Sequence, residues 1–363
     1  MPFATALPRM PSSDRHPGPS SAVSVPLARA AAFLGPARGA FAALVLLFVL
    51  ASLVEPVFLK SANLTRSVLQ ASSFSGIVAL GMTFVILAGG IDLSVGSLFA
   101  LSGVAAVLAG NALAARGAAP GAAFAVACAA AVAAGLAGGA VNGALVAAGR
   151  IPPFIATLGT YSIYRSLALY FAHSSRVAPD PAVAPLFAAF SNFTALRLPS
   201  AVLLFLALAV LFDLWLSLTP FGRHVLATGA GERVALLSGI RTNRVRFATY
   251  LIAGFCAGAA AVPMIGRLNG IESSNAGLFY ELDAIAAVVI GGASMAGGRG
   301  SVRGTLFGVL ILGIVTDLLQ LRHLNPSLKD AVKGLVIIAA VLVQGGALSH
   351  LFLPPNRNKG TTA

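Results

Sequence analysis

Long apolar runs recur through most of this chain, and they limit its possible folds more than any other feature. Most of the runs have about 20 residues, which lets a helix cross the roughly 30 Å hydrocarbon core of a bilayer. Backbone N–H and C=O groups find no water there, so a helix has to satisfy them internally. Only 10% of the residues are charged and 58% are hydrophobic, whereas soluble domains carry about 25% charged residues. The sequence therefore predicts an all-α integral membrane protein.

The apolar runs predict a polytopic bundle of about ten transmembrane helices. They lie near residues 39–58, 65–88, 93–110, 120–148, 153–172, 199–219, 247–267, 281–296, 304–321 and 331–349. The run at 281–296 is short and opens with Glu281 and Asp283, which indicates a broken or partly re-entrant helix. The run at 121–149 is longer than the bilayer is thick, so we expect it to tilt or to extend into the interface.

Basic residues set the expected orientation, because Lys and Arg in short loops are retained on the cytoplasmic side. The net charge of +13 comes from basic residues scattered between apolar runs, which is typical of topology signals and not of a nucleic-acid site. The densest group, from Arg223 to Arg246, assigns the loop 220–246 to the cytoplasm. We expect residues 1–38 to be a disordered cytoplasmic tail, residues 39–350 the transmembrane domain, and residues 351–363 a second cytoplasmic tail.

Acidic side chains in or beside the spans need a reason, since one at the bilayer centre costs about 2.5–3.5 kcal/mol. Asp92 stands in GGIDLSVGS between two spans, where it either caps the next helix or takes part in transport or gating. The same alternatives apply to Glu281 and Asp283. For Asp213 we expect snorkelling or a basic loop neighbour. For Asp317 a helix–helix hydrogen bond and a pore position stay equally open.

Neutral polar and small residues also recur inside the spans. The polar ones can line a path for a neutral, hydroxyl-rich solute or bind neighbouring helices together; they are Ser94, Ser97, Asn142, Thr157, Thr160, Tyr161 and Ser162. Glycines at four-residue spacing predict faces where helices pack closely, with a hinge as the alternative; they are Gly135, Gly139, Gly143, Gly254 and Gly258.

Residues suited to catalysis or metal binding do not gather in this sequence. Its five histidines lie in predicted tails and loops, and none is spaced with Cys or Glu as a metal ligand. The stretch GGRGSVRGT at 297–305 lacks the pattern of a phosphate-binding loop. Cys128 and Cys256 lie in apolar runs, where small core residues are expected. The sequence thus predicts no catalytic site, no metal, no cofactor and no ATPase activity of its own.

The cytoplasmic loop contains a short amphipathic stretch that ends at a glycine, a plausible helix stop. Its candidate docking residues are Glu232, Arg233, Ala235, Leu236, Ser238, Gly239 and Ile240. Such a helix either lies on lipid head groups or docks into a soluble partner.

Three long motifs carry a resemblance to a known family. They are VALGMTFVILAGGIDLSVGSLFALSG at 78–103, VNGALVAAGRIPPFIATLGTYSIYRSLA at 141–168 and YELDAIAAVVIGGASMAGGRGSVRG at 280–304. In these residues the chain resembles the membrane permease of ribose-type sugar importers of the ATP-binding cassette (ABC) class, within the larger family that includes branched-chain amino-acid permeases. The resemblance covers about residues 60–350.

The resemblance implies a permease of a bacterial cytoplasmic (inner) membrane that works in an assembly. The implied partners are a second permease chain in a homodimer, two ATPase subunits on the cytoplasmic face, a periplasmic sugar-binding protein, membrane lipid and a small sugar or polyol. It also implies that residues Glu232 to Ile240 couple the permease to the ATPase. Which sugar is carried does not follow. A secondary carrier, which would need coupling ions, and a membrane enzyme acting on a lipid or sugar carrier remain as alternatives.

Overall fold

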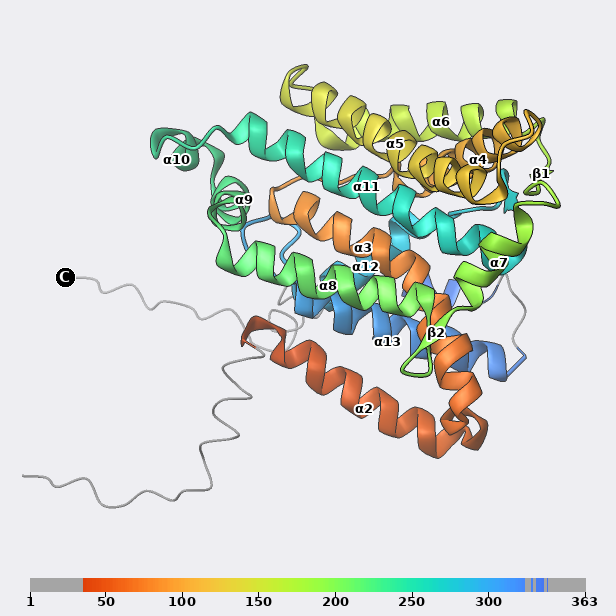
Figure 1. Cartoon of the computed structure of the whole chain (residues 1–363). Helices are drawn as coiled ribbons and strands as arrows, with labels where there is room; N and C mark the ends of the chain where they lie inside the picture. The colour runs from red at the N-terminus through yellow and green to blue at the C-terminus, as the bar shows by residue number, and fades with distance from the viewer. Residues whose placement is uncertain (1–34, 324–327, 329–330, 336–337, 339–363) are drawn as a thin grey trace, which may run out of the picture. The chain divides into compact units, whose positions relative to one another are not determined.

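Helices make up almost all of the regular structure. The computed structural model describes residues 35–323, 328, 331–335 and 338, and from Pro36 onward the described residues belong to one unit. Figure 1 shows its long helices running side by side along a common direction. The predicted tails at 1–38 and 351–363 lie almost wholly outside the described residues.

Six helices in the described part of the chain are long and apolar enough to cross a membrane. They are η3 (Asn63–Gln70) joined to α3 (Ala71–Leu87), α4 (Val95–Ala114), α5 (Pro120–Ala147), α8 (Ser200–Leu218), α11 (Thr242–Leu268) and α13 (Val302–Leu321). The predicted polytopic helical membrane fold is confirmed. The 28 residues of α5 would extend over roughly 42 Å at 1.5 Å per residue, so the expected excess length over the bilayer is present.

The other predicted spans differ from these six. Helix α2 (Arg38–Val54) is apolar but shorter, and α6 (Pro153–Phe171) is a helix whose Thr, Ser and Tyr residues make it less apolar. Helix α12 (Tyr280–Ile290) has only 11 residues, so the short span predicted at 281–296 is indeed interrupted. Of the predicted span at 331–349, residues 331–335 are helical and most of the rest lies outside the described residues. The count of ten spans therefore stays a prediction.

Short elements gather at the two ends of the long helices (Figure 1). At one end lie α9 (Pro220–Ala230) and α10 (Glu232–Leu237); at the other lie β1, α7 and β2. The remaining short elements are η1 (Gly35–Ala37), η2 (Pro56–Leu59), α7 (Ala184–Asn192), β1 (Arg176–Val177), β2 (Thr194–Ala195), β3 (Leu198–Pro199) and β4 (Ile271–Glu272). Strand β1 pairs antiparallel with β4, and β2 pairs antiparallel with β3.

Glycines bring α5 and α11 into backbone contact, on the faces where their spacing predicts close packing. A Cβ atom added to Gly135 would overlap the carbonyl oxygen of Gly254 and lie 3.0 Å from the backbone nitrogen of Gly258. A Cβ atom on Gly254 would lie 2.9 Å from the Cα of Gly139. These positions allow the two helices to approach closely, which is the known role of small residues between membrane helices.

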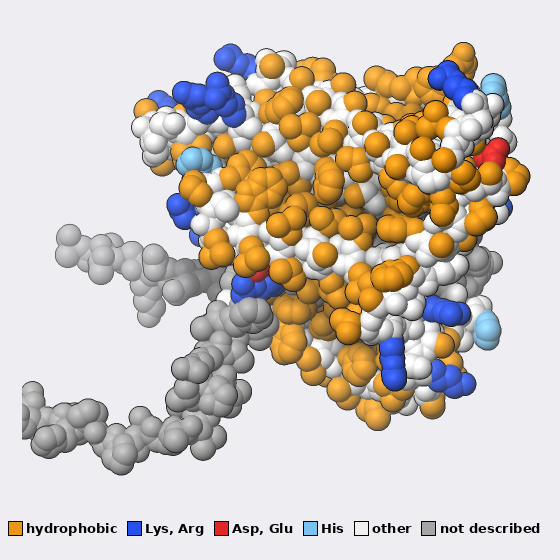
Figure 2. All heavy atoms as spheres, viewed as in Figure 1, with side chains coloured by type: hydrophobic (Ala, Val, Ile, Leu, Met, Phe, Trp, Pro, Cys, Tyr) orange, Lys and Arg blue, Asp and Glu red, His pale blue; other side chains and the backbone are white. Residues whose placement is uncertain are grey.

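The face of the molecule seen in Figure 2 is apolar in the middle and mostly basic at the ends. Figure 2 shows hydrophobic side chains covering the central part of the visible face, with Lys and Arg mostly near the two ends. Large apolar side chains such as Leu46, Leu53 and Val210 are exposed on this surface. A wide apolar band between charged ends is the surface that a bilayer requires.

Two acids that the sequence left ambiguous have partners on other helices. Asp213 on α8 forms an ion pair with Arg303 on α13, with 2.7 Å between Oδ2 and Nη2. A basic neighbour of Asp213 is thus present, and it comes from the start of another helix. Asn63 donates to Asp317 Oδ2 at 2.7 Å, which supports the helix–helix hydrogen bond for Asp317.

The connections after α3 and after α12 meet at the end of the bundle that carries α9. The N–H of Gly298 donates to the carbonyl of Leu87 at 3.0 Å. A Cβ atom on Gly229 at the end of α9 would lie 2.6 Å from the backbone nitrogen of Gly298. Residues 88–94, which carry Asp92, are therefore held between α9 and the interior of the bundle.

Candidate functional site

Asp92 is fully buried in the connection between α3 and α4. Its Oδ1 accepts hydrogen bonds from the backbone N–H of Ser94 at 2.8 Å and from the Ser94 hydroxyl at 2.7 Å. Ser94 is the residue just before α4. The carboxylate thus forms a tight turn with Ser94 just before α4. Its donors among the described residues are Ser94 and Asn142 and not the N–H groups that open α4, so the suggested capping role was wrong.

Helices α5 and α6 complete a polar network around Asp92. Asn142 Nδ2 donates to the Ser94 hydroxyl at 2.7 Å and, more weakly, to Asp92 Oδ2 at 3.3 Å. Thr160 in turn donates to Asn142 Oδ1 at 2.7 Å. Thr157 lies 3.4 Å from the carbonyl of Ile91 and donates to its own helix at 2.9 Å. Five of the candidate path residues therefore lie together: Asp92, Ser94, Asn142, Thr157 and Thr160.

Burial and hydrogen bonding act on Asp92 in opposite directions. Burial raises the pKa of its carboxyl above the usual value, while the hydrogen bonds from Ser94 and Asn142 lower it. A buried carboxyl is stable only when such donors surround it. The network therefore fixes the connection between α3 and α4, and it would have to rearrange if that connection moved.

Two tyrosines belong to this site although the sequence did not single them out. Tyr250 of α11 donates to the carbonyl of Ile91 at 3.3 Å, and Tyr164 of α6 donates to the carbonyl of Gly138 at 2.9 Å. Buried tyrosine hydroxyls usually need a partner, so a Tyr inside an apolar span was an available signal. Tyr161, which we did predict, lies outside the network and neighbours Arg165.

Glu281 and Asp283 lie in the first turn of α12 but do not cap it. The N-cap residue is Phe279, and no side-chain cap bond is present there. Asp283 instead forms an ion pair with Lys333, at 3.2 Å. Glu281 is 8% exposed, and its Oε2 has no hydrogen-bond partner among the described residues. The expected capping role was wrong because Asp283 pairs across the bundle and the acids follow the N-cap residue.

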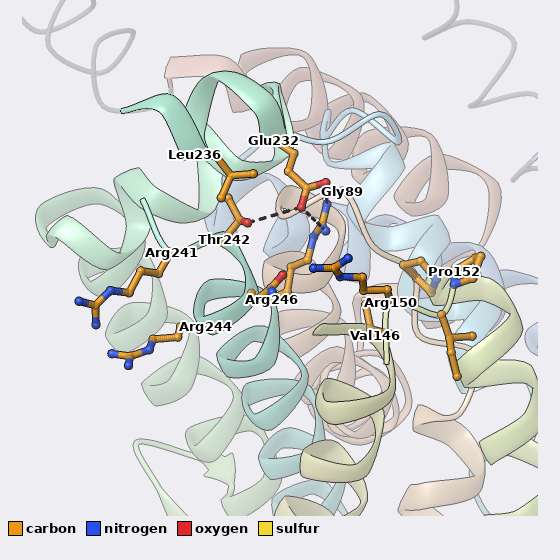
Figure 3. A pocket seen from close by; sticks show the side chains of 13 residues that line it. Gly89, Val146, Arg150, Pro152, Glu232, Leu236, Arg241, Thr242, Arg244 and Arg246 are labelled. Atoms are coloured by element: carbon orange, nitrogen blue, oxygen red, sulfur yellow. Dashed lines mark hydrogen bonds and ion pairs between the residues drawn. The ribbon is translucent and has the colours of Figure 1, made fainter. Parts of the chain in front are cut away.

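The predicted docking stretch forms helix α10, which is attached to α11 by an ion pair. Arg246 Nη1 and Nη2 donate to the two carboxylate oxygens of Glu232 at 2.7 and 2.9 Å. Figure 3 shows this pair, with Thr242 also pointing toward Glu232. Bidentate pairs of this kind add geometric specificity to their electrostatic attraction. The start of α10 is thereby fixed to the start of a long membrane helix.

Most of the remaining α10 side chains face outward. Ala235 is buried, whereas Val234, Leu236 and Leu237 are exposed, Leu237 to 83%. The chain then leaves the helix through Gly239, whose φ of 81° lies in the left-handed region, as expected for a glycine just past a helix end. The other predicted docking residues are Arg233, which is exposed, Ser238, whose hydroxyl donates to Val234, and Ile240, whose N–H donates to Ala235.

A cavity of about 750 Å³ opens beside the Glu232–Arg246 ion pair. Its lining comes from α10, the start of α11 and the connection between α5 and α6, and it includes Arg150, Arg241 and Arg244. In Figure 3 Arg241 and Arg244 extend away from the ion pair, while Arg150 follows the end of α5. These arginines make this end of the bundle basic, as expected for a cytoplasmic face. In the part of the chain described, no cluster of three His, Cys, Asp or Glu side chains is placed to hold a metal.

The family of branched-chain amino acid transport system permease components matches residues 64–341. The chain belongs to this family. Like the family, it is therefore a multi-pass permease component of a bacterial inner membrane.

Individual relatives cover most of the permease chain. It is 41% identical over 306 residues to the ribose import permease protein of Bacillus subtilis (strain 168). The aligned region covers 84% of this chain and 91% of the relative. It is 40% identical over 308 residues to the ribose import permease protein of Escherichia coli (strain K12), with 83% and 91% covered. The fructose import permease protein of Rhizobium meliloti is 36% identical over 284 residues, with 76% of each chain covered. No solved structure matches this permease.

Proposed function

We propose that this chain is the membrane permease subunit of an ABC importer that carries a monosaccharide or a related polyol. The observation that supports this most strongly is its 41% identity to a ribose import permease over 91% of that protein's length. A galactofuranose transporter permease is also 34% identical over 312 residues. The sugar named thus differs among relatives, so the proposal is made for the class of solute.

The energy for import comes, in this proposal, from a separate ATPase that docks at α10. Two observations support this assignment. The apolar side chains of Val234, Leu236 and Leu237 are exposed and offer a surface for a partner. Glu232 links this helix to α11 through its ion pair with Arg246. One turn along α11 from Arg246, Tyr250 bonds the carbonyl of Ile91, next to Asp92. A displacement of α10 can therefore pass through α11 to the buried connection before α4.

Within this scheme the polar network around Asp92 acts as a gate. Its members are hydrogen-bonded to one another, which favours a role in holding the connection in place over a role in binding solute. The proposed gate or path residues are Asp92, Ser94, Asn142, Thr157, Tyr161, Glu281 and Asp283. The assembly that we propose contains a second copy of the permease, two ATPase subunits, a periplasmic sugar-binding protein and surrounding lipid.

Uptake specificity tests this function. Membrane vesicles would contain the permease and its ATPase, with a purified periplasmic binding protein encoded beside the permease added to the periplasmic side. We expect ATP-dependent uptake of those pentoses, hexoses or polyols that the binding protein binds. Uptake of leucine or valine, with none of the sugars or polyols taken up, would contradict the proposal.

A further inference from the structure

A small polar cavity lies between α3, α12 and α13, and no residue of the Asp92 network lines it. Its volume is about 170 Å³, which leaves room for several waters or one small polar solute. Hydroxyl groups dominate its polar lining: Ser67, Ser72 and Ser75 from η3 and α3, Tyr280 from α12 and Thr316 from α13.

One ion pair completes the polar lining. Lys333 Nζ donates to both carboxylate oxygens of Asp283, at 3.2 and 3.3 Å. The Asp283 side chain is only 18% exposed and the Lys333 side chain 21%. Among the described residues that line the cavity, these two opposite charges cancel. An ion pair of low exposure that faces a cavity beside several hydroxyl groups offers a charged donor and a charged acceptor to a polar ligand.

The hydroxyl groups offer both acceptors and donors to such a ligand. Thr316 donates its proton to the carbonyl of Leu312 at 2.8 Å, so its oxygen lone pairs remain as acceptors. Ser72 faces α13 at Gly313, where a Cβ atom would overlap its hydroxyl oxygen. The absence of a side chain at Gly313 therefore leaves space for this hydroxyl at the wall of the cavity.

We propose that this cavity is a subsite for one monosaccharide on its path through the permease, an inference that rests on the proposed function. A sugar hydroxyl both donates and accepts, which matches a wall of hydroxyls beside a carboxylate and an ammonium group. The described lining carries two charges that cancel, which suits a neutral solute. A free amino acid would have to separate Asp283 from Lys333 in order to pair its own two charges.

The position of the cavity agrees with a solute arriving from outside. Ser67 and Ser72 fall in the first half of the span Asn63–Leu87, Ser75 falls at its midpoint, and Thr316 falls in the second half of α13. With the amino terminus in the cytoplasm, both segments lie in the outer half of the bundle. That is the side to which a periplasmic binding protein delivers its sugar.

Protection of a cysteine from labelling tests occupancy directly. Ser75→Cys would be introduced with Cys128 and Cys256 changed to alanine, and an impermeant maleimide would be added to the reconstituted complex. We expect D-ribose, D-fructose or D-galactose in excess to slow labelling at least threefold. Ser174→Cys, an exposed position near β1, is the matched control and should react at the same rate with and without sugar. Equal labelling rates at position 75, or protection by leucine or valine alone, would overturn the subsite.

Charge exchange separates a ligand site from a structural latch. Asp283→Asn and Lys333→Met should each lower maximal sugar uptake at least tenfold, and the exchange Asp283→Lys with Lys333→Asp should not restore it. Restored uptake in the exchanged variant would mean that the pair only holds two helices together, which would refute the proposal. Ser52→Ala, which removes an exposed hydroxyl on α2, is the neutral control.

If the wild-type complex imports sugar while position 75 is unprotected, only the subsite fails. If the wild type imports none, the proposed function itself fails.

Discussion

The close packing of α5 on α11 makes Gly254→Val a sharp test of the fold. The new Cβ atom would overlap the carbonyl oxygen of Gly135 and lie 2.9 Å from the Cα of Gly139, whereas carbon atoms pack best at about 3.5–4.0 Å. The helices would have to separate by roughly 0.6 Å or more, before the two methyl groups are counted. Overpacking of this kind costs about 1–3 kcal/mol, and we expect a loss near 2 kcal/mol in the free energy of unfolding.

The matched control is Gly159→Val on α6, where an added Cβ would meet nothing within 4 Å. Both variants place the same side chain in the interior of a long α-helix, so helix propensity affects them alike. Thermal unfolding in detergent, followed by the loss of the monodisperse fraction, compares the two. Equal midpoints for Gly254→Val and Gly159→Val would refute the account of glycine-mediated packing. Because Tyr250 lies one turn before Gly254 and bonds Ile91 at 3.3 Å, uptake should fall only in Gly254→Val.

Three further predictions concern the coupling helix, the topology and the buried acid. Gly239→Trp should insert normally but lose uptake and substrate-stimulated ATPase activity, because the left-handed φ costs a side chain about 1–2 kcal/mol and the indole would obstruct docking. The control Gly239→Asn should retain both activities. Wild-type activity in the Trp variant would show that α10 does not couple the permease to the ATPase. A cysteine at Asp180 should be labelled from outside by an impermeant reagent, and a cysteine at Leu237 only after the membrane is permeabilised. Labelling of both from outside would contradict the predicted cytoplasmic position of the loop 220–246. Asp92→Asn can keep an acceptor at Oδ1 for the two Ser94 donors but places an amide donor opposite Asn142 Nδ2. This donor–donor mismatch should cost about 1–3 kcal/mol in stability and reduce uptake; unchanged detergent stability and uptake would remove Asp92 from the gate.

Hydropathy was sufficient to predict the long helices, because the bilayer requires apolar runs of sufficient length. The interruption near 281–296 was also visible, since Glu281 and Asp283 shorten the apolar run there. Glycine spacing predicted a close-packing face on α5 and on α11, because four-residue spacing puts the glycines on one helix face, but it did not predict that these two faces meet. These features depend on local sequence, and the sequence carries them directly.

The partners of the charged residues could not be read in the same way. Asp213 pairs with Arg303 and Asp283 with Lys333, across 90 and 50 residues of chain, so only the tertiary arrangement brings them together. The motif GGIDLSVGS marked Asp92, but Tyr250 came to it from a helix whose register the sequence does not specify. Local capping was therefore overestimated for α12, where a distant lysine proved the stronger partner of Asp283.

The dependence of transport on a separate ATPase tests the central claim most directly. The purified permease would be reconstituted into liposomes with and without the ATPase subunit, and sugar uptake and ATP hydrolysis would be measured with the sugar-loaded binding protein present. The account predicts no ATP hydrolysis above background by the permease alone, and sugar accumulation only when both the ATPase and ATP are present. Accumulation by the permease alone, driven by a proton or sodium gradient, would contradict it.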